Sequence, residues 1–248
     1  MMLQFYQNVW AHHGGPAHPI WRAELKIEHA RTPKQSRSRE SFDRVLDAAT
    51  ELVTEGGYQT LTLAEVSRRS RVSIGSIYCR VESKDDLFRA MQARAFAAIE
   101  DEFSTIVTRI RRRRLPLREL VPVLVRELAT HLQRHARLIA ACIERGASDP
   151  VVGTLGRKSH AQTGLDFRLL LLERHAEFVH PDPEHAAATC FHVVYGSLAR
   201  YLGFGMQRDH SGVAEGNWRQ LIADLGLMCL AFLAADLRKI TGATDPID

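Results

Sequence analysis

Four arginines are gathered in a short stretch of the first third of the chain. Arg68, Arg69, Arg71 and Arg80 lie between residues 66 and 81, and that stretch contains no aspartate or glutamate. A guanidinium group binds phosphate or carboxylate oxygens through paired, charge-assisted hydrogen bonds. The 248-residue chain has a net charge of only +4, so the placement of this charge matters more than its sum. The stretch therefore predicts a surface for phosphates or for an acidic partner.

Two short helices joined by a tight turn must position these arginines. Thr62 and Glu65 have the spacing of a capping box at the start of the first helix, and Ser73 can cap the second. Ile77 is the inward residue of the second helix, and both helices can pack on the apolar stripe of a helix at residues 42–53. This is the plan of a helix-turn-helix, whose second helix enters the major groove of DNA.

The second helix, expected at about residues 73–80, is too weak to stand alone. It is short, and Gly75 lies inside it, where a glycine costs about 1 kcal/mol relative to alanine. We expect neighbouring helices to hold it in place, while its small outward residues let the backbone come close to DNA. Two other interpretations stay open: a structural hairpin with a solvated basic face, and a helical module that docks an acidic protein partner.

The segment that contains both helices has a characteristic pattern. It reads RVLDAATELVTEGGYQTLTLAEVSRRSRVSIGSIYCRVESKDDLFRAM and resembles the DNA-binding domain of the TetR family of bacterial transcriptional regulators. The family pattern is ILDAA..LF...G, then GY..T(S/T)L..IA..AGVS.GT(L/I)Y.HF.SK..L, and the resemblance covers about residues 39–99. The matching positions are Leu46, Ala48, Ala49, Leu52, Gly57, Tyr58, Thr62, Leu63, Val66, Val72, Ser73, Gly75, Ile77, Tyr78, Ser83, Lys84 and Leu87.

The resemblance implies which residues contact DNA. Residues 73–76 would face base edges or sugars, Tyr78 a phosphate or a thymine methyl, and Thr62 and Lys84 phosphates. A basic arm before the first helix would reach the minor groove or the backbone. The chain departs from the pattern at Arg71, which replaces a turn glycine and so predicts a positive φ. The implied DNA-binding residues are Arg37, Arg39, Thr62, Ser73, Ile74, Gly75, Ser76, Tyr78, Arg80 and Lys84.

The whole chain is predicted to be all-α, with about nine helices. We expect a flexible extension with a basic arm at residues 1–35, and a helix-turn-helix DNA-binding domain at 36–99 with its motif at 62–81. The remaining residues, 100–248, would form an effector-binding and dimerisation domain. Beyond the motif, apolar periodicity predicts helices at about 85–113, 115–135, 138–146, 150–179, 184–207 and 214–240.

The resemblance also implies what the larger domain does. Its last two helices, within about 184–240, are apolar over more than one face and would pair with those of a second copy. Such a homodimer would read a palindromic operator as a repressor. A small-molecule effector, bound within residues 100–180, would release it from double-stranded DNA. The pocket candidates, chosen by their chemistry, are His131, Cys142, Arg145, Phe167, Arg168, His192 and Tyr195.

No residue pattern predicts an enzyme, a cofactor or a metal site. The phosphate-binding loop, the dinucleotide fingerprint, the zinc-protease motif and the serine nucleophile motif are absent from the sequence. His12, His13 and His18 lie close together, but no acid or cysteine completes a metal site. The four widely spaced cysteines predict no disulfide. Because no signal peptide or membrane-length apolar run is found, we expect a cytoplasmic protein.

Overall fold

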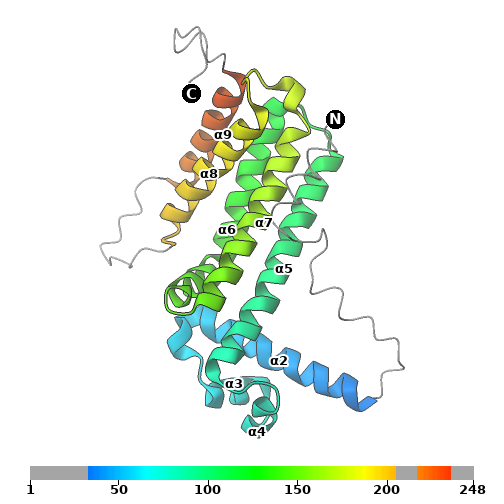
Figure 1. Cartoon of the computed structure of the whole chain (residues 1–248), viewed down its shortest axis with the longest axis vertical. Coiled ribbons are helices and arrows are strands. Elements are labelled where there is room, and N and C mark those ends of the chain that lie inside the picture. The colour runs from blue at the N-terminus through cyan, green and yellow to red at the C-terminus, as the bar shows by residue number, and fades with distance from the viewer. Residues whose placement is uncertain (1–32, 205–216, 236–248) are drawn as a thin grey trace. The chain divides into compact units, whose positions relative to one another are not determined.

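The protein's structure, a computed structural model, describes residues 33–204 and 217–235, with side chains from Ser38 onward. His12, His13 and His18 lie outside the described residues. The described residues divide into two units, one up to Glu40 and one from Ser41 onward. The described residues form eight α-helices, two short 3-10 helices and no strand, which confirms the all-α class (Figure 1). The elements are α2 (Pro33–Gly56), η2 (Tyr58–Thr60), α3 (Leu63–Ser70), α4 (Ile74–Tyr78), α5 (Lys84–Arg112), α6 (Leu117–Gly146), α7 (Pro150–Leu172), η3 (His175–Glu177), α8 (Pro183–Tyr201) and α9 (Trp218–Ala234).

One predicted division between helices is wrong. The helices expected at 115–135 and 138–146 are a single helix, α6, which runs from Leu117 to Gly146. No glycine or proline lies between His135 and Leu138, so nothing in the local sequence ends the helix there. This fusion reduces the nine expected helices to the eight that the described part of the chain contains.

Tertiary contacts end α7 earlier than its apolar pattern predicts. The helix stops at Leu172 rather than near residue 179. The guanidinium Nε of Arg174 donates a hydrogen bond to the carbonyl of Leu115 at 2.8 Å. The amide of Val179 donates to the carbonyl of Leu233, at the end of α9, at 2.9 Å. Since these bonds fix the segment to the start of α6 and to α9, it cannot continue as a helix.

The first described helix ends where the sequence predicts. α2 stops at Gly56, and Gly57 adopts a φ of 76°, which a glycine tolerates without strain. The apolar stripe of α2 within residues 42–53 is buried from Val45 onward. α2 begins at Pro33, so Arg37 and Arg39 belong to a helix and not to an extended arm.

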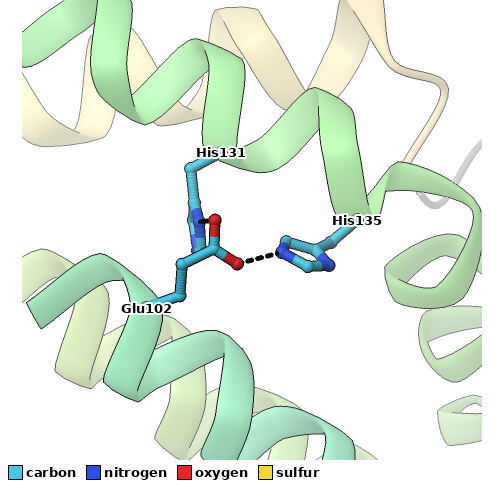
Figure 2. A group of neighbouring side chains, drawn as sticks. All are labelled: Glu102, His131 and His135. Atoms are coloured by element: carbon cyan, nitrogen blue, oxygen red, sulfur yellow. Dashed lines mark hydrogen bonds and ion pairs between the residues drawn. The ribbon is translucent and has the colours of Figure 1, made fainter. Parts of the chain in front are cut away.

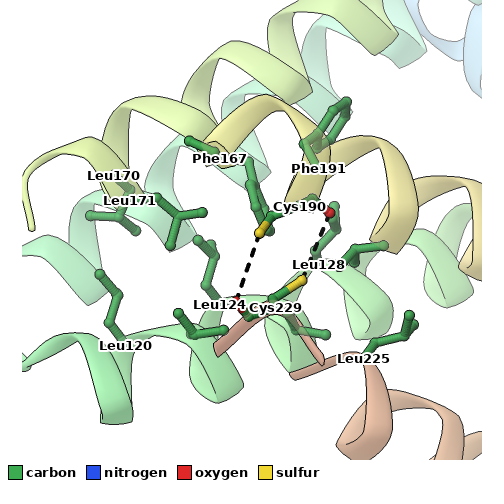
Figure 3. Close-up of a cluster of buried hydrophobic side chains, with 14 of the residues drawn as sticks. Leu120, Leu124, Leu128, Phe167, Leu170, Leu171, Cys190, Phe191, Leu225 and Cys229 are labelled. Carbon is green, nitrogen blue, oxygen red and sulfur yellow. Dashed lines mark hydrogen bonds between the residues drawn. The ribbon is translucent and has the colours of Figure 1, made fainter. Parts of the chain in front are cut away.

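Two clusters of buried apolar side chains form the core of the described residues from 41 to 235. One holds together the head, which we define as residues 41–83, and continues into α5 from Leu87 to Ile99 and into the ends of α6 and α7 through Cys142 and Val152. The other lies in the body, residues 84–235, among α5 to α9 (Figure 3). There Cys190 and Cys229 each donate to the other's backbone carbonyl, at 4.0 and 3.9 Å. All four cysteines are free thiols. No described helix is long and apolar enough to span a membrane.

Candidate DNA-binding surface and effector cavity

Thr62 caps the first helix of the motif, α3. Its side-chain oxygen accepts a hydrogen bond from the amide of Glu65 at 3.2 Å. The return half of the capping box is not formed, because the Glu65 carboxylate binds Arg68 and Arg69 at 2.5 and 3.0 Å. The amide of Thr62 donates instead to the Thr60 carbonyl at 2.9 Å. Thr62 therefore begins α3 as predicted and remains exposed to solvent.

The turn between α3 and α4 is fixed by short side chains. Arg71 has a φ of 58°, the left-handed conformation predicted from its place in the family pattern. This conformation costs about 1–2 kcal/mol for a residue with a Cβ. The hydroxyl of Ser70 accepts from the amide of Val72 at 3.3 Å, and that of Ser73 from the amide of Ser76 at 3.2 Å. The two serines thus compensate a turn that Arg71 disfavours.

The helix α4 has five residues, and one of them is buried. Ile77 is fully buried against the head, whereas Ile74 and Tyr78 are 41% and 52% exposed. Gly75 and Ser76 are also exposed, and a Cβ added to Gly75 would meet no atom within 4 Å. The outward face of α4 is therefore uncharged and open, and it is small at Gly75 and Ser76. This is the arrangement that the sequence predicts for a helix held by its neighbours.

The cationic face of the motif is partly neutralised, which the local sequence did not reveal. Arg69 forms ion pairs with Glu65 and with Glu55 of α2, at 3.0 and 2.7 Å. Arg68 pairs with Glu65 as well, so two of the four arginines already have carboxylate partners. Hydrogen bonds from both arginines lower the pKa of Glu65 to about 2. The acids come from outside residues 66–81, and only the folded chain brings Glu55 to α3.

The remaining predicted DNA-binding residues precede or follow the two helices of the motif in the sequence. Arg37 and Arg39 lie on α2, and Arg39 is exposed. Arg80 follows α4 and is exposed, with its guanidinium 5.4 Å from the centre of the Phe42 ring. Lys84 begins α5, and its ammonium lies 3.8 Å from the centre of the Tyr58 ring. Burial lowers the pKa of Lys84 there.

A polar contact joins the start of α5 to the turn between α6 and α7. Arg145 of α6 lies 3.0 Å from the Asp85 carboxylate and 4.4 Å from the centre of the Tyr58 ring. Arg89 of α5 donates to the carboxylate of Asp149 at 3.0 Å. Asp149 is nearly fully buried and caps α7. Burial acts to raise the pKa of Asp149, but the hydrogen bonds from Arg89 and from two backbone amides outweigh it, so the pKa lies below its usual value.

A cavity of about 420 Å³ lies beside this contact, between α5, α6, α7 and α8. Its volume is in the range of small-molecule sites, and its lining is mainly apolar with a few polar groups. Burial raises the pKa of Tyr195 in its wall to about 12, so the phenol there stays neutral. The lining includes Phe96, Ile99, Leu132, Ile139, Ile143, Val152, Gly156, Arg157, Ser159, His160 and Thr163.

Three of the seven predicted pocket residues line this cavity: His131, Cys142 and Tyr195. The other four lie elsewhere. Arg145 takes part in the polar contact with Asp85, and Phe167 belongs to the buried core of the body. Arg168 donates to the carbonyl of Gly164 at 3.1 Å, and His192 faces solvent on α8. The chemistry of a side chain alone did not tell which face of its helix borders the cavity.

The structure brings together three titratable residues, of which the sequence indicated only His131, as a pocket candidate. His131 and His135 on α6, together with Glu102 on α5, bring ligand atoms within 4.8 Å of one another (Figure 2). His135 hydrogen-bonds Glu102 at 2.8 Å, and Arg134 pairs with the same carboxylate. Burial lowers the pKa of His131 to about 4. The spacing of the two histidines was visible in the sequence, but the approach of Glu102 depends on helix packing.

Residues 45–91 match the family model described as bacterial regulatory proteins, tetR family. No curated protein matches the chain. A TetR-family transcriptional regulator from Mesorhizobium loti, described as putative, shares 17% identity at a TM-score of 0.65, over 79% of this chain and 96% of that one. The fatty acid degradation regulator FadR of Bacillus halodurans shares 15% at 0.55, over 82% and 97%. FadR of Bacillus subtilis, solved with stearoyl-CoA, shares 14% at 0.54, over 77% and 98%.

The solved structures and the family model are independent comparisons, one of fold and one of sequence. At such low identities the solved structures show a shared fold and no more. The family model, in contrast, rests on sequence and covers the segment from the apolar stripe of α2 to the first turns of α5. Both agree with the resemblance predicted from the sequence. The chain therefore carries the helix-turn-helix domain of the tetR family of bacterial regulatory proteins and has the all-α fold of TetR-family transcriptional regulators.

Proposed function

We propose that this protein is a ligand-responsive transcriptional repressor that binds a palindromic operator as a dimer and leaves it when a small molecule binds. The observation that carries the proposal is the exposure of α4. A five-residue helix cannot hold itself in water, yet here it is capped by Ser73, anchored by Ile77 and open on every other face. Small outward residues such as Gly75 and Ser76 allow a backbone to approach base edges closely.

The apolar surface of the last two helices supports a dimer. Leu227 and Met228 on α9 are 62% and 57% exposed, and Val193 on α8 is 40% exposed. Large apolar side chains this exposed on the last two helices favour coverage by a partner. A second copy related by a two-fold axis would cover the same patch on both chains. Two helix-turn-helix motifs presented in this way would require a palindromic site.

The effector that fits the cavity has an apolar body and a polar end. The walls are mainly aliphatic, while Tyr195, His160 and Ser159 offer hydrogen bonds and Arg157 is exposed at the rim. A carboxylate or phosphate could bind the Arg157 guanidinium while a hydrocarbon portion fills the interior. Because FadR of Bacillus subtilis was solved with stearoyl-CoA, acyl-CoA thioesters are the first compounds to test.

The polar contact around Asp149 is the proposed route from the cavity to the head. The cavity borders the last turn of α6 and the first turns of α7, on either side of Asp149. Asp149 and Arg145 bind the first turns of α5, directly after the head. An effector that shifts the turn between α6 and α7 would therefore move the head. It can release DNA only by binding the released conformation more tightly.

Selection of bound duplexes from a random pool tests the DNA-binding part. The selected sequence should be palindromic, and its affinity should fall steeply with salt because phosphate contacts release counterions. Replacing Tyr78 or Lys84 by alanine should weaken binding by about 1–3 kcal/mol. The matched control is Arg118→Ala, a highly exposed site on the body, which should leave duplex affinity unchanged. If no duplex is selected at any salt concentration, the acidic-partner interpretation replaces this one.

Blocking the cavity tests the effector part separately. A Cβ added to Gly156 meets no atom within 4 Å, so Gly156→Leu should fold and project its side chain into the cavity. The variant should keep duplex affinity and lose the response to an acyl-CoA thioester that releases the unaltered protein. Free coenzyme A, which lacks the acyl chain, serves as the matched compound. An acyl-CoA that binds without changing duplex affinity would contradict the release mechanism.

A further inference from the structure

We propose that Glu102, His131 and His135 form a binding site for a divalent transition-metal ion of the zinc class. The site lies in the body, where α5 and α6 pack together, and it shares His131 with the effector cavity (Figure 2). It is separate from the helix-turn-helix motif. Its existence does not depend on whether the protein binds DNA.

The donor set selects the chemistry of the ion. Two imidazoles and one carboxylate suit zinc and its neighbours, whereas magnesium and calcium prefer oxygen ligands alone. His131 and His135 are four residues apart on α6, so both rings project from the same face of the helix. Glu102 supplies the third ligand from α5. Three protein ligands leave a fourth position for water or for a donor atom of another molecule.

The distances are close to those of a metal site. Nε2 of His135 lies 2.8 Å from one oxygen of Glu102, and Nδ1 of His131 lies 3.7 Å from the other. Ligand atoms around tetrahedral zinc are about 3.3–3.6 Å apart when each bond is near 2.0–2.2 Å. All three ligand atoms already lie within 4.8 Å of one another. Rotation of these side chains would have to bring the three ligand atoms to the zinc spacing.

The buried ring of His131 is the second observation that indicates a ligand. The residue is only 2% exposed, yet neither of its ring nitrogens has a hydrogen-bond partner among the described residues. A buried polar group without a partner costs about 1–3 kcal/mol. Figure 2 shows its ring beside the Glu102 carboxylate, opposite His135. A metal ion between the three side chains would satisfy one of the two nitrogens.

A cavity gives the ion access to the site, and one cationic side chain competes with the ion for Glu102. A second cavity, of about 600 Å³, reaches the group between α5 and α6 and is lined by Glu102, His131 and Arg134 among others. The Arg134 guanidinium pairs with Glu102, so it would have to leave when a cation binds. Its side chain is 58% exposed and can turn into solvent. Loss of this guanidinium should therefore favour the metal.

Zinc titration of the full-length chain, first stripped with a chelator, tests the proposal directly. Competition with a chromophoric chelator should reveal a zinc ion bound at this site. Glu102→Gln and His135→Ala should each weaken its binding by more than about 100-fold, because even indirect partners of metal ligands cost 10–100-fold. Arg134→Ala should bind zinc as tightly as the unaltered chain or more tightly. Cobalt should give the visible absorption of a low-coordinate site, and both ligand variants should lose it.

Two controls separate this site from other sources of binding. A chain with His12, His13 and His18 all replaced by alanine should keep the zinc ion assigned to α5 and α6. Thermal unfolding with chelator present should be similar for Glu102→Gln and the unaltered chain, since the substitution keeps the side-chain volume. The proposal is overturned if the unaltered chain does not compete for zinc. It is equally overturned if zinc binding survives both Glu102→Gln and His135→Ala.

Discussion

The head and the body of this protein are held together in different ways. In the head, α3 and α4 have eight and five residues, each begins at a side-chain cap, and α4 has one buried residue. In the body, the helices after α5 have 17–30 residues, and buried side chains recur along each of them. The two short helices of the head thus depend on a few residues at fixed points. The body spreads its stability and can leave space for a cavity.

The difference between the head and the body is tested most severely by substitution of Ile77, the anchor of α4. Ile77→Ala should destabilise the head by about 2–5 kcal/mol, because a fully buried side chain is truncated and α4 has no other anchor. Hydrogen exchange should show faster opening of head amides, with the body little changed. Ile74→Ala, on the exposed side of the same helix, should alter stability by less than about 0.5 kcal/mol. Equal effects at the two positions would contradict the single-anchor account.

The next largest effect is expected at Asp149, which binds Arg89 of α5 within the body, close to where the head ends. Asp149→Ala removes the cap of α7 and the partner of Arg89, and should cost about 2–3 kcal/mol of unfolding free energy. The pKa of Asp149 is lowered in the fold, so its contribution is complete above the ordinary value of 3.8 and is lost as the pH falls below it. Denaturant unfolding should therefore show a constant difference in unfolding free energy between the unaltered chain and Asp149→Ala from pH 7 to pH 5. This difference should narrow in more acidic buffer.

Packing inside the body is tested at Gly164 of α7. A Cβ at this position would lie 2.6 Å from Phe191, so Gly164→Ala should destabilise the protein by about 1–3 kcal/mol. Gly196→Ala on α8 is the matched control, because its added Cβ meets no atom within 4 Å. Thermal unfolding of both variants measures the difference. A stable Gly164→Ala protein would mean that the body is looser around Phe191 than its packing indicates.

The cap of α4 should have a smaller effect on stability. Ser73→Ala removes the hydrogen bond from the Ser76 amide and should cost about 1 kcal/mol, whereas Ser73→Asn should keep most of the cap. The measurement is the free energy of unfolding of the head, followed by hydrogen exchange. If asparagine fails to restore protection, the serine hydroxyl has a role other than capping.

The smallest change in stability is expected at Gly75, with the opposite sign. Gly75→Ala meets open space and improves helix propensity, so it should stabilise the head by up to about 1 kcal/mol. If α4 lies in a DNA groove, the same methyl group should weaken duplex binding. Stability and affinity would then change in opposite directions. An unchanged affinity would place the backbone of Gly75 away from the DNA.

Local signals in the head were accurate because the physical causes are local. A hydroxyl at Thr62 or Ser73 caps whichever helix begins there, and a residue in the turn position of Arg71 must adopt a positive φ. The apolar stripe of α2 predicted its buried face for the same reason. Ion pairs were less predictable, because Glu55 reaches Arg69 only after α2 and α3 have packed together.

In the body, the sequence did not predict which side chains line the cavity or where α7 ends. No local residue distinguished Phe167, which lies in the core, from Cys142, which lies in the cavity wall. The end of α7 depends on Arg174 binding the carbonyl of Leu115, a contact between distant parts of the chain. Nothing in the sequence around Glu102 indicated that it would lie next to the two histidines.

The sequence by itself determined the helical class, the caps and turn of the motif, and the family resemblance, since these follow from residues within one or two helical turns of each other. The tertiary structure decided the cavity, the neutralisation of Arg69 and the meeting of Glu102 with His131 and His135. These features depend on the rotation and depth at which long helices pack. Apolar periodicity specifies that a helix has a buried face, but it does not specify which side chain of the neighbouring helix lies opposite.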